Sequence, residues 1–431
     1  MSAHRQMGIK HALLPLLTSA LRAGIMIGHR TQSRPALLLS LALFTGLLSV
    51  GATARADETV SFTGETMTVT GGAPLARFDI SFVDPRLGIY ILADRSNSQV
   101  DVFSVVGRKF LFSVPGFAGF HGSNDTAGPN GVLTVNHREI WAGDGNNATD
   151  HTLSSVKVID LLTQTISDTI VIPNGEARAD EMAFDPEDQV LLVANDADPI
   201  PFITFISTRP GHKILRQIFF PEATNGIEQS QWSPKTGLFY LNLPEVAPNG
   251  AKNGDGQLVV IDPERLRIVQ RFPTHNCEAA GLALGPDNQA LLGCSGSTST
   301  GVTLPNESQI IDLRNGHVVA TFPQVGGSDE VWFNPGDNHY YLAARNNATG
   351  PVLGTIDADP PRFDNNAATT SSGDHSVAAD PIFNNIFVPL TAGSANKICP
   401  NGCIGIYRHR PLDADDRGDE HEDERAENRD R

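Results

Sequence analysis

One phrase recurs seven times along the chain and restricts its fold more than any other feature. Each copy has a polar residue, a short apolar strand, Asp-Pro or a similar turn, and a second apolar strand, as in DISFVDPRLGIYILAD. Successive copies begin 46 to 52 residues apart, at Asp79, Asn130, Asp180, Glu228, Ala280, Asp329 and His375. A fixed period of this length is typical of repeat architectures. The chain is therefore expected to consist of seven copies of one structural unit.

Each copy continues with further strands. Third strands read VKVIDL (156–161), LVVIDP (258–263) and QIIDL (309–313), and fourth strands read TISDTIVI (165–172) and IVQRF (268–272). β-branched and aromatic residues alternate with polar ones, and Gly, Asn, Asp and Pro mark the turns. Four short antiparallel strands in 40–50 residues make a propeller blade. The sequence predicts an all-β fold, a seven-bladed β-propeller of four-stranded antiparallel blades, over residues 57–410.

The two ends of the repeat array indicate how the ring closes. The seventh copy has its third strand at 404–409 and then enters a charged segment, so it lacks a fourth strand. Residues 59–70 read as a strand pair without a blade. We expect this N-terminal segment to supply the outer strand of blade 7, which would protect exposed strand edges. The alternative is a free N-terminal arm.

Several strand phrases resemble the YVTN-type propeller repeat, in which a strand like YVTN is followed by a loop and V-x-V-I-D. They are VKVIDL, LVVIDPERLRIV and QIIDLRNGHVVATF, with second strands YILAD, LLVAN, FYLNL, LLGCS, YYLAA and IFVPL. The resemblance covers residues 57–410 and implies the propeller fold. Proteins of this fold include periplasmic and surface proteins, the haem-binding propeller of nitrite reductase and bacterial lactonases. Fold alone therefore does not determine the function.

The N-terminus has the pattern of a secretory signal peptide. Residues 36–50 are mostly apolar and carry no charge, Arg30 and Arg34 precede them, and Ala54-Arg55-Ala56 follows. The apolar run is shorter than the roughly 20 residues of a membrane span. We expect residues 1–56 to be removed after Ala56, and translation to start at Met1 or at Met26. The chain is then periplasmic or secreted and has no membrane span after cleavage; the alternative is an uncleaved anchor.

Charge restricts the partners. The formal net charge is −17, and loss of residues 1–56, which hold six basic residues and no acid, takes it to −23. Such a surface repels nucleic acid and attracts metal cations or cationic ligands. Residues 411–431 are mostly acidic and basic, and we interpret them as an acidic disordered tail.

Four cysteines indicate two disulfides in an oxidising compartment. Cys277 and Cys294 flank the turn at 285–288, and Cys399 and Cys403 bracket Pro-Asn-Gly. The rival interpretation, a metal-binding cysteine cluster, has no CxxC pair to support it.

The repeat alignment places polar residues at one height around the central channel. The candidate ligand or metal residues are Asp79, Asn130, Asp180, Glu181, Glu228, Asp329 and Glu330. Crowded carboxylates need a cation, a proton or water. Carboxylate and amide oxygens suit Ca²⁺. A divalent metal ion or a small polar ligand is therefore expected at the acidic mouth of the channel.

Histidines form a second candidate group. His121, His275 and His375 precede or begin blades 2, 5 and 7 at the same end of the propeller, where they could hold Zn²⁺ or act as catalytic bases. The alternative is that they share no role. Arg77 and Arg178 either recognise an anionic ligand or pair with the ring acids.

Three functions remain open from the sequence. The first is a periplasmic propeller that binds a metal ion or a small polar ligand. The second is a metal-assisted hydrolase or lyase, lactonase-like, in which the ring acids hold the metal and a histidine moves protons. The third is a protein-interaction scaffold with a periplasmic protein as partner. Trp232 and Trp332, inside first strands, either pack between blades or form a stacking platform for sugars.

Overall fold

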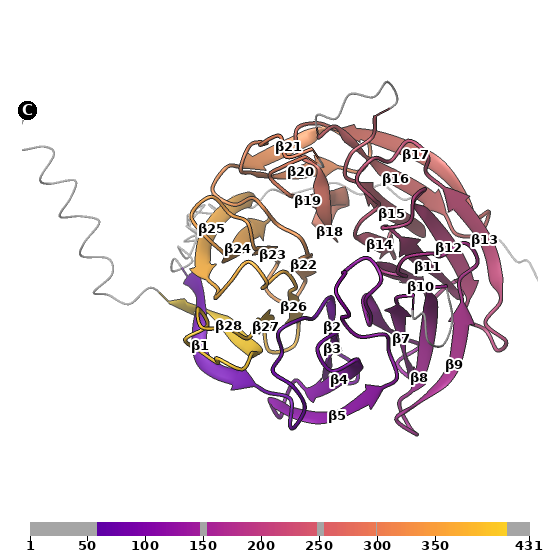
Figure 1. Ribbon diagram of the computed structural model, residues 1–431. Coiled ribbons are helices and arrows are strands. Elements are labelled where there is room, and N and C mark those ends of the chain that lie inside the picture. The colour runs from indigo at the N-terminus through magenta and orange to yellow at the C-terminus, as the bar shows by residue number, and fades with distance from the viewer. Residues whose placement is uncertain (1–57, 147–152, 248–253, 299, 412–431) are drawn as a thin grey trace, which may run out of the picture. The chain divides into compact units, whose positions relative to one another are not determined.

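The computed structural model describes residues 58–146, 153–247, 254–298 and 300–411, which form seven four-stranded antiparallel sheets in a ring (Figure 1). The predicted seven-bladed β-propeller is confirmed. The described residues contain no α-helix, and their one helical element is a 3₁₀ turn, Pro286–Asn288. The described residues therefore include no helix that is long and apolar enough to cross a membrane. The predicted signal peptide and all but the first residue of the predicted tail lie outside the described residues.

The blades follow one another along the chain, each built from the channel outward. Blades 1 to 3 contain β2 (Ser81–Asp84), β3 (Ile89–Asp94), β4 (Gln99–Ser104) and β5 (Lys109–Pro115); β6 (Val132–Val135), β7 (Glu139–Asp144), β8 (Ser155–Asp160) and β9 (Thr165–Val171); and β10 (Met182–Asp185), β11 (Val190–Asn195), β12 (Phe202–Ser207) and β13 (Ile214–Phe219). Blades 4 to 6 contain β14 (Ser230–Ser233), β15 (Leu238–Leu243), β16 (Gly256–Asp262) and β17 (Arg267–Thr274); β18 (Ala279–Leu284), β19 (Gln289–Cys294), β20 (Ser308–Asp312) and β21 (Val318–Phe322); and β22 (Val331–Asn334), β23 (His339–Ala344), β24 (Val352–Ala358) and β25 (Pro361–Ala368). Blade 7 contains β26 (Ala378–Asp380), β27 (Asn385–Leu390), β28 (Cys403–Pro411) and β1 (Glu58–Met67).

Burial explains the sequence pattern of the strands. The second strands β3 and β11 are buried along their whole length, because sheets cover both of their faces, and they are correspondingly apolar throughout. The outer strand β9 alternates between exposed and partly buried positions and carries polar residues on its exposed face. The predicted third and fourth strands lie within two residues of their observed bounds.

The hydrophobic core is divided among seven clusters, and each cluster joins two neighbouring blades. Trp141, fully buried in β7, packs in the cluster between blades 2 and 3. The last cluster in the ring joins blade 7 to blade 1 through Phe387 and Tyr90, whose ring centroids are 5.2 Å apart. Because every blade is held from both sides, the ring is stabilised as a closed unit.

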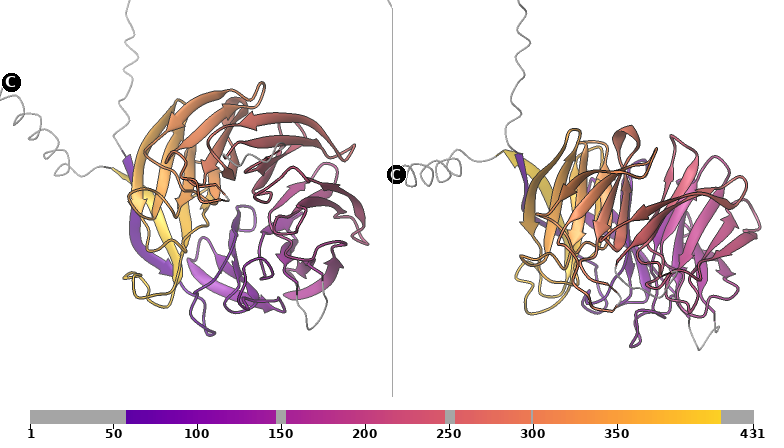
Figure 2. Two further views of the ribbon diagram at one scale, coloured as in Figure 1. Left: turned by 45° about the horizontal axis from the view of Figure 1, so that its top comes forward. Right: turned by 90° about the horizontal axis from the view of Figure 1, so that it is seen from above.

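The N-terminal strand closes the ring, as predicted. Figure 2 shows β1, in indigo, along β28, in yellow. The two strands pair antiparallel, with Val60 opposite His409 and Met67 opposite Ile404. The expected strand pair at 59–70 is wrong in detail, because the segment forms one strand with an irregularity between Phe62 and Thr66. Gly64 has a φ of 87° there, which lets the chain bulge and then continue along β28.

Both predicted disulfides are confirmed. Cys277 and Cys294 lie across the β18–β19 hairpin with a Cα–Cα distance of 4.6 Å. Cys399 and Cys403 close a short loop before β28, with a Cα–Cα distance of 6.0 Å. The chain therefore has no free cysteine for the rival metal cluster.

Candidate functional site

The residues that begin the seven copies gather at one end of the central channel. Most of them come two residues before the first strand of their blade, as Asp79 does before β2 and Asp180 before β10. The blades approach closely at this level: a Cβ on Gly131 would lie 2.1 Å from the backbone oxygen of Asp180. A side chain at position 131 would push blades 2 and 3 apart, so glycine allows their polar side chains to meet.

These side chains enclose a cavity of about 220 Å³, which we call the polar chamber. Its walls carry six carboxyl groups and four guanidinium groups, together with the imidazole of His375. The acids are Asp79, Asp180, Glu181, Glu228, Asp329 and Glu330, and the arginines are Arg77, Arg95, Arg178 and Arg345. The structure thus brings six of the seven predicted ring residues to one chamber, and Asn130 hydrogen bonds to an arginine in its wall.

On the blade 1 side, the buried Arg95 neutralises Asp79. Its guanidinium forms an ion pair with the Asp79 carboxylate, and its Nε donates a hydrogen bond to Asn130 Oδ1 at 3.0 Å. Burial alone would raise the pKa of Asp79, but Arg95 and a hydrogen bond to His375, helped by Arg178, hold that pKa well below its usual range. Asp79 is therefore a fixed anion that already has its countercharges.

On the blade 3 side, Arg178 lies between two aspartates. Its Nε is 2.6 Å from Asp180 Oδ2 and its Nη2 is 2.7 Å from Asp196 Oδ2, which confirms the ion-pair interpretation for this arginine. Asp180 Oδ1 is buried and has no hydrogen-bond partner among the described residues. Burial raises the pKa of Asp180 well above its usual range. Arg178 acts to lower this pKa, whereas repulsion from Asp196 and Asp79 raises it further. Asp180 Oδ1 is thus a buried acceptor without a hydrogen bond in the wall of the polar chamber.

Glu228 is the least compensated acid of the polar chamber. Its carboxylate makes no hydrogen bond or ion pair among the described residues, although Asp329 nearby is 3.1 Å from Arg345 Nη2. Burial, together with repulsion from Asp196, Asp329 and Asp180, raises the pKa of Glu228 well above its usual range. A positive charge placed beside Glu228 would relieve this repulsion.

The polar chamber ends at a waist inside the channel. Glu181 of blade 3 and Glu330 of blade 6 hydrogen bond across it, and both are more than nine-tenths buried. Burial and their mutual proximity raise the pKa of Glu181 well above its usual range, and burial also raises that of Glu330. Gln229 makes a second contact across the channel, since its Nε2 donates a hydrogen bond to the backbone oxygen of Val331 at 3.2 Å.

The three candidate histidines do not come together. His375 lines the polar chamber, where it stacks on Phe78 with 5.0 Å between ring centroids. Its Nδ1 donates to the backbone oxygen of Gly373 at 2.6 Å, and its Nε2 is 3.3 Å from Asp79 Oδ1. His121 and His275 are exposed, outside the chamber wall. Both nitrogens of His375 face oxygen acceptors, so the ring is arranged to position and neutralise Asp79.

Sequence reasoning missed Arg95, Asp196 and Arg345, although a signal was present. Each comes directly after the second strand of its blade, and each lies 16 residues after the residue that begins its copy. The same offset reaches Thr391, which also lines the polar chamber. The ends of the second strands of blades 1, 3, 6 and 7 therefore add polar residues next to the first ring.

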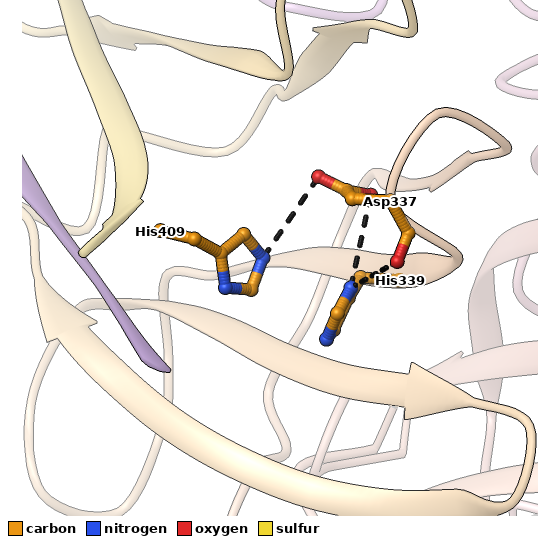
Figure 3. A group of neighbouring side chains, drawn as sticks. All are labelled: Asp337, His339 and His409. Atoms are coloured by element: carbon orange, nitrogen blue, oxygen red, sulfur yellow. Dashed lines mark hydrogen bonds and ion pairs between the residues drawn. The ribbon is translucent and has the colours of Figure 1, made fainter. Parts of the chain in front are cut away.

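A separate group lies where the ring closes. Asp337 in the β22–β23 turn, His339 at the start of β23 and His409 in β28 bring ligand-type atoms within 4.8 Å of one another (Figure 3). It is the one such group of three among the residues that the structure describes. His409 Nε2 is 3.8 Å from Asp337 Oδ2 and 2.9 Å from the Tyr341 hydroxyl. Imidazole and carboxylate are ligand types that Zn²⁺ uses.

Comparison with known proteins adds little to the fold. No protein-family model matches the chain, and no curated protein matches its sequence. Among solved structures, it is similar to a chain of Kuenenia stuttgartiensis hydrazine synthase, with 15% identity and a TM-score of 0.49. The match covers 62% of this chain and 80% of that one. The propeller assignment therefore rests on the strand topology described above.

Proposed function

We propose that this chain is an exported, periplasmic binding propeller with YVTN-type repeats, and that its polar chamber holds a small polar ligand with positive charge. The observation that carries the proposal is the uncompensated carboxylate of Glu228 in the wall of the chamber. It makes no hydrogen bond or ion pair among the described residues, and burial and the neighbouring acids raise its pKa well above its usual range. Buried anions without a countercharge are costly, and a bound cation supplies that countercharge.

Size and spacing favour a molecule over a bare metal ion. The chamber of about 220 Å³ has room for roughly seven waters at about 30 Å³ each, or for a short organic cation. Among the described residues, no three acids of the chamber bring ligand atoms within 4.8 Å of one another. A bare ion needs oxygens at about 2.3–2.6 Å on several sides, whereas an ammonium group at each end of a short chain reaches oxygens that lie further apart.

The first prediction compares two probes of matched shape. 1,4-Diaminobutane, a dication at neutral pH, should bind measurably by titration calorimetry at low salt, and 1,4-butanediol should not. Glu228→Gln should weaken binding of the diamine about ten- to hundredfold, because a hydrogen bond to a charged group is worth roughly 1.5–3 kcal/mol. Glu187→Gln, which removes one exposed carboxylate from a turn outside the chamber, is the matched control and should leave the affinity unchanged.

The pH dependence of the same binding has a definite sign. The pKa values of Glu228 and Asp180 are raised, so protons compete with the diamine, and its affinity should increase as pH rises from about 5 to about 8. Glu228→Gln should flatten this increase. Equal binding of diamine and diol, or full binding by Glu228→Gln, would contradict the proposal.

The group at the ring closure favours a second candidate function, the binding of a transition metal. Asp337, His339 and His409 offer two imidazoles and a carboxylate, and Asp364 Oδ2 lies 2.8 Å from His339 Nε2. Because His409 belongs to blade 7 and the other two to blade 6, a metal here would cross-link the last two blades.

Elemental analysis tests this second candidate. After incubation with Zn²⁺ and removal of free metal, the wild-type chain should retain about one equivalent. His409→Gln should retain less than a tenth of that, while His317→Gln, at an exposed position outside the group, should retain the wild-type amount. Equal zinc in all three proteins, or none in the wild type, would eliminate this candidate.

A further inference from the structure

The channel contains a second cavity with a different character. It measures about 740 Å³ and is lined by the first strands of the blades and by the turns that follow them. Its wall includes five aromatic side chains: Phe82 of β2, Phe184 of β10, Trp232 of β14, and Trp332 and Phe333 of β22. We call it the aromatic chamber. It lies beyond the waist from the polar chamber, because Glu181 and Glu330 line both cavities.

The aromatic residues have two roles in the ring. Trp332 packs against the clusters on both sides of blade 7, and its ring meets Phe82 edge-on at 5.6 Å. Trp232 packs against the cluster between blades 3 and 4. All three rings nevertheless remain partly exposed, and the surface that they leave uncovered is the chamber wall. The inter-blade packing is thus accompanied by free aromatic surface inside a cavity.

The two ends of the aromatic chamber differ in charge. At the waist, the carboxyl groups of Glu181 and Glu330 line the chamber and offer acceptor oxygens. At the other end, Arg86 and His137 lie in turns, and His137 Nδ1 is 2.7 Å from Asp84 Oδ2. A positive group of a ligand is therefore attracted towards the waist and away from the turns. π faces along the wall attract the same charge.

We propose that the aromatic chamber binds an organic cation with an apolar or aromatic body, its cationic group at Glu181 and Glu330 and its body among Phe82, Trp232 and Trp332. The volume lies within the 300–1,000 Å³ range of small-molecule pockets, and apolar walls with a few convergent polar groups are typical of such pockets. Glu181 and Glu330 line both chambers, but the polar-chamber proposal rests on Glu228 and this one on the aromatic wall, so the two can be tested separately.

Three probes of equal size and different charge test the proposal. 2-Phenylethylammonium should bind at least about tenfold more tightly than 2-phenylethanol, and phenylacetate should bind most weakly of the three. Titration calorimetry gives the affinities, and quenching of tryptophan fluorescence gives the location. The chain has three tryptophans, and Trp141 is fully buried outside the chamber, so a quenching signal should come from Trp232 and Trp332.

Variants separate the two chambers and guard against loss of folding. Trp332→Leu should reduce binding of 2-phenylethylammonium about tenfold or more, whereas Trp141→Phe should leave it unchanged. The double variant Glu181→Gln, Glu330→Gln keeps the shape of the waist, and with it the cation and the alcohol should bind equally. Glu228→Gln should have a much smaller effect on this probe than the double variant, since Glu228 lines only the polar chamber. Equal affinity for all three probes in the wild type, or full binding by the Glu181→Gln, Glu330→Gln protein, would overturn the proposal.

Discussion

A chain that starts at Thr68, and so lacks β1, is expected to lose cooperative unfolding and to aggregate, whereas a chain that starts at Asp57 folds. Strand β1 is the outer strand of blade 7 and covers the edge of β28. Its Val60 and Met67 are almost completely buried, and each such side chain contributes about 1.5–3 kcal/mol. Domains are typically stable by only about 5–15 kcal/mol, so this loss, with an open ring and a bare strand edge, should exceed the margin.

Circular dichroism during urea denaturation, together with size-exclusion chromatography, measures this effect. Removal of residues 412–431 is a control truncation at the other end of the chain and should leave the denaturation midpoint unchanged. A synthetic peptide of residues 58–69, added during refolding, should restore part of the cooperative transition. A shortened chain that unfolds cooperatively at nearly the wild-type midpoint would show that β1 contributes little to the stability of the ring.

Replacement of Arg178 by alanine is the second large effect, and we expect it to lower the free energy of unfolding by about 3–5 kcal/mol. The guanidinium is mostly buried and pairs with both Asp180 and Asp196 at 2.6–2.7 Å. Its loss leaves Asp180, in the wall of the polar chamber, and the neighbouring Asp196 without the countercharge that they share. Removal of one partner from a buried ion pair is costly for this reason.

Urea denaturation at neutral and at acid pH tests the cause of the Arg178→Ala effect. The pKa of Asp180 is raised already, and loss of Arg178 raises it further, so the defect should shrink as pH falls and the aspartate takes up a proton. Arg314→Ala removes a solvent-exposed ion pair to Asp312 and should leave the denaturation midpoint nearly unchanged. A defect that is the same at both pH values would indicate lost packing instead of lost charge.

The sequence repeat made the architecture predictable, but it predicted only the features that each copy contains. The seven equivalent strand pairs and the missing fourth strand of blade 7 were enough to predict the ring and its closure. The bulge of β1 was missed, because a Gly64 turn signal also fits a hairpin. Arg95 and Arg345 were missed because only the first position of each copy was compared around the ring.

The contacts that cross the channel could not be predicted. Glu181 and Glu330 belong to blades with two others between them, and they meet because packing between blades sets the width of the channel. The same holds for His409, which reaches Asp337 only after blade 7 docks on blade 6. The division of the channel into a polar and an aromatic chamber therefore depends on tertiary structure, although the residues of both were visible as repeat positions.

A crystal structure of the protein grown with 1,4-diaminobutane tests the central claim most directly. We predict electron density for the diamine in the polar chamber, with one nitrogen about 3 Å from the Glu228 carboxylate. The density should be absent in crystals of Glu228→Gln grown in the same way. A polar chamber that contains only water, in crystals where calorimetry shows the diamine to bind, would contradict the claim and place the binding site elsewhere.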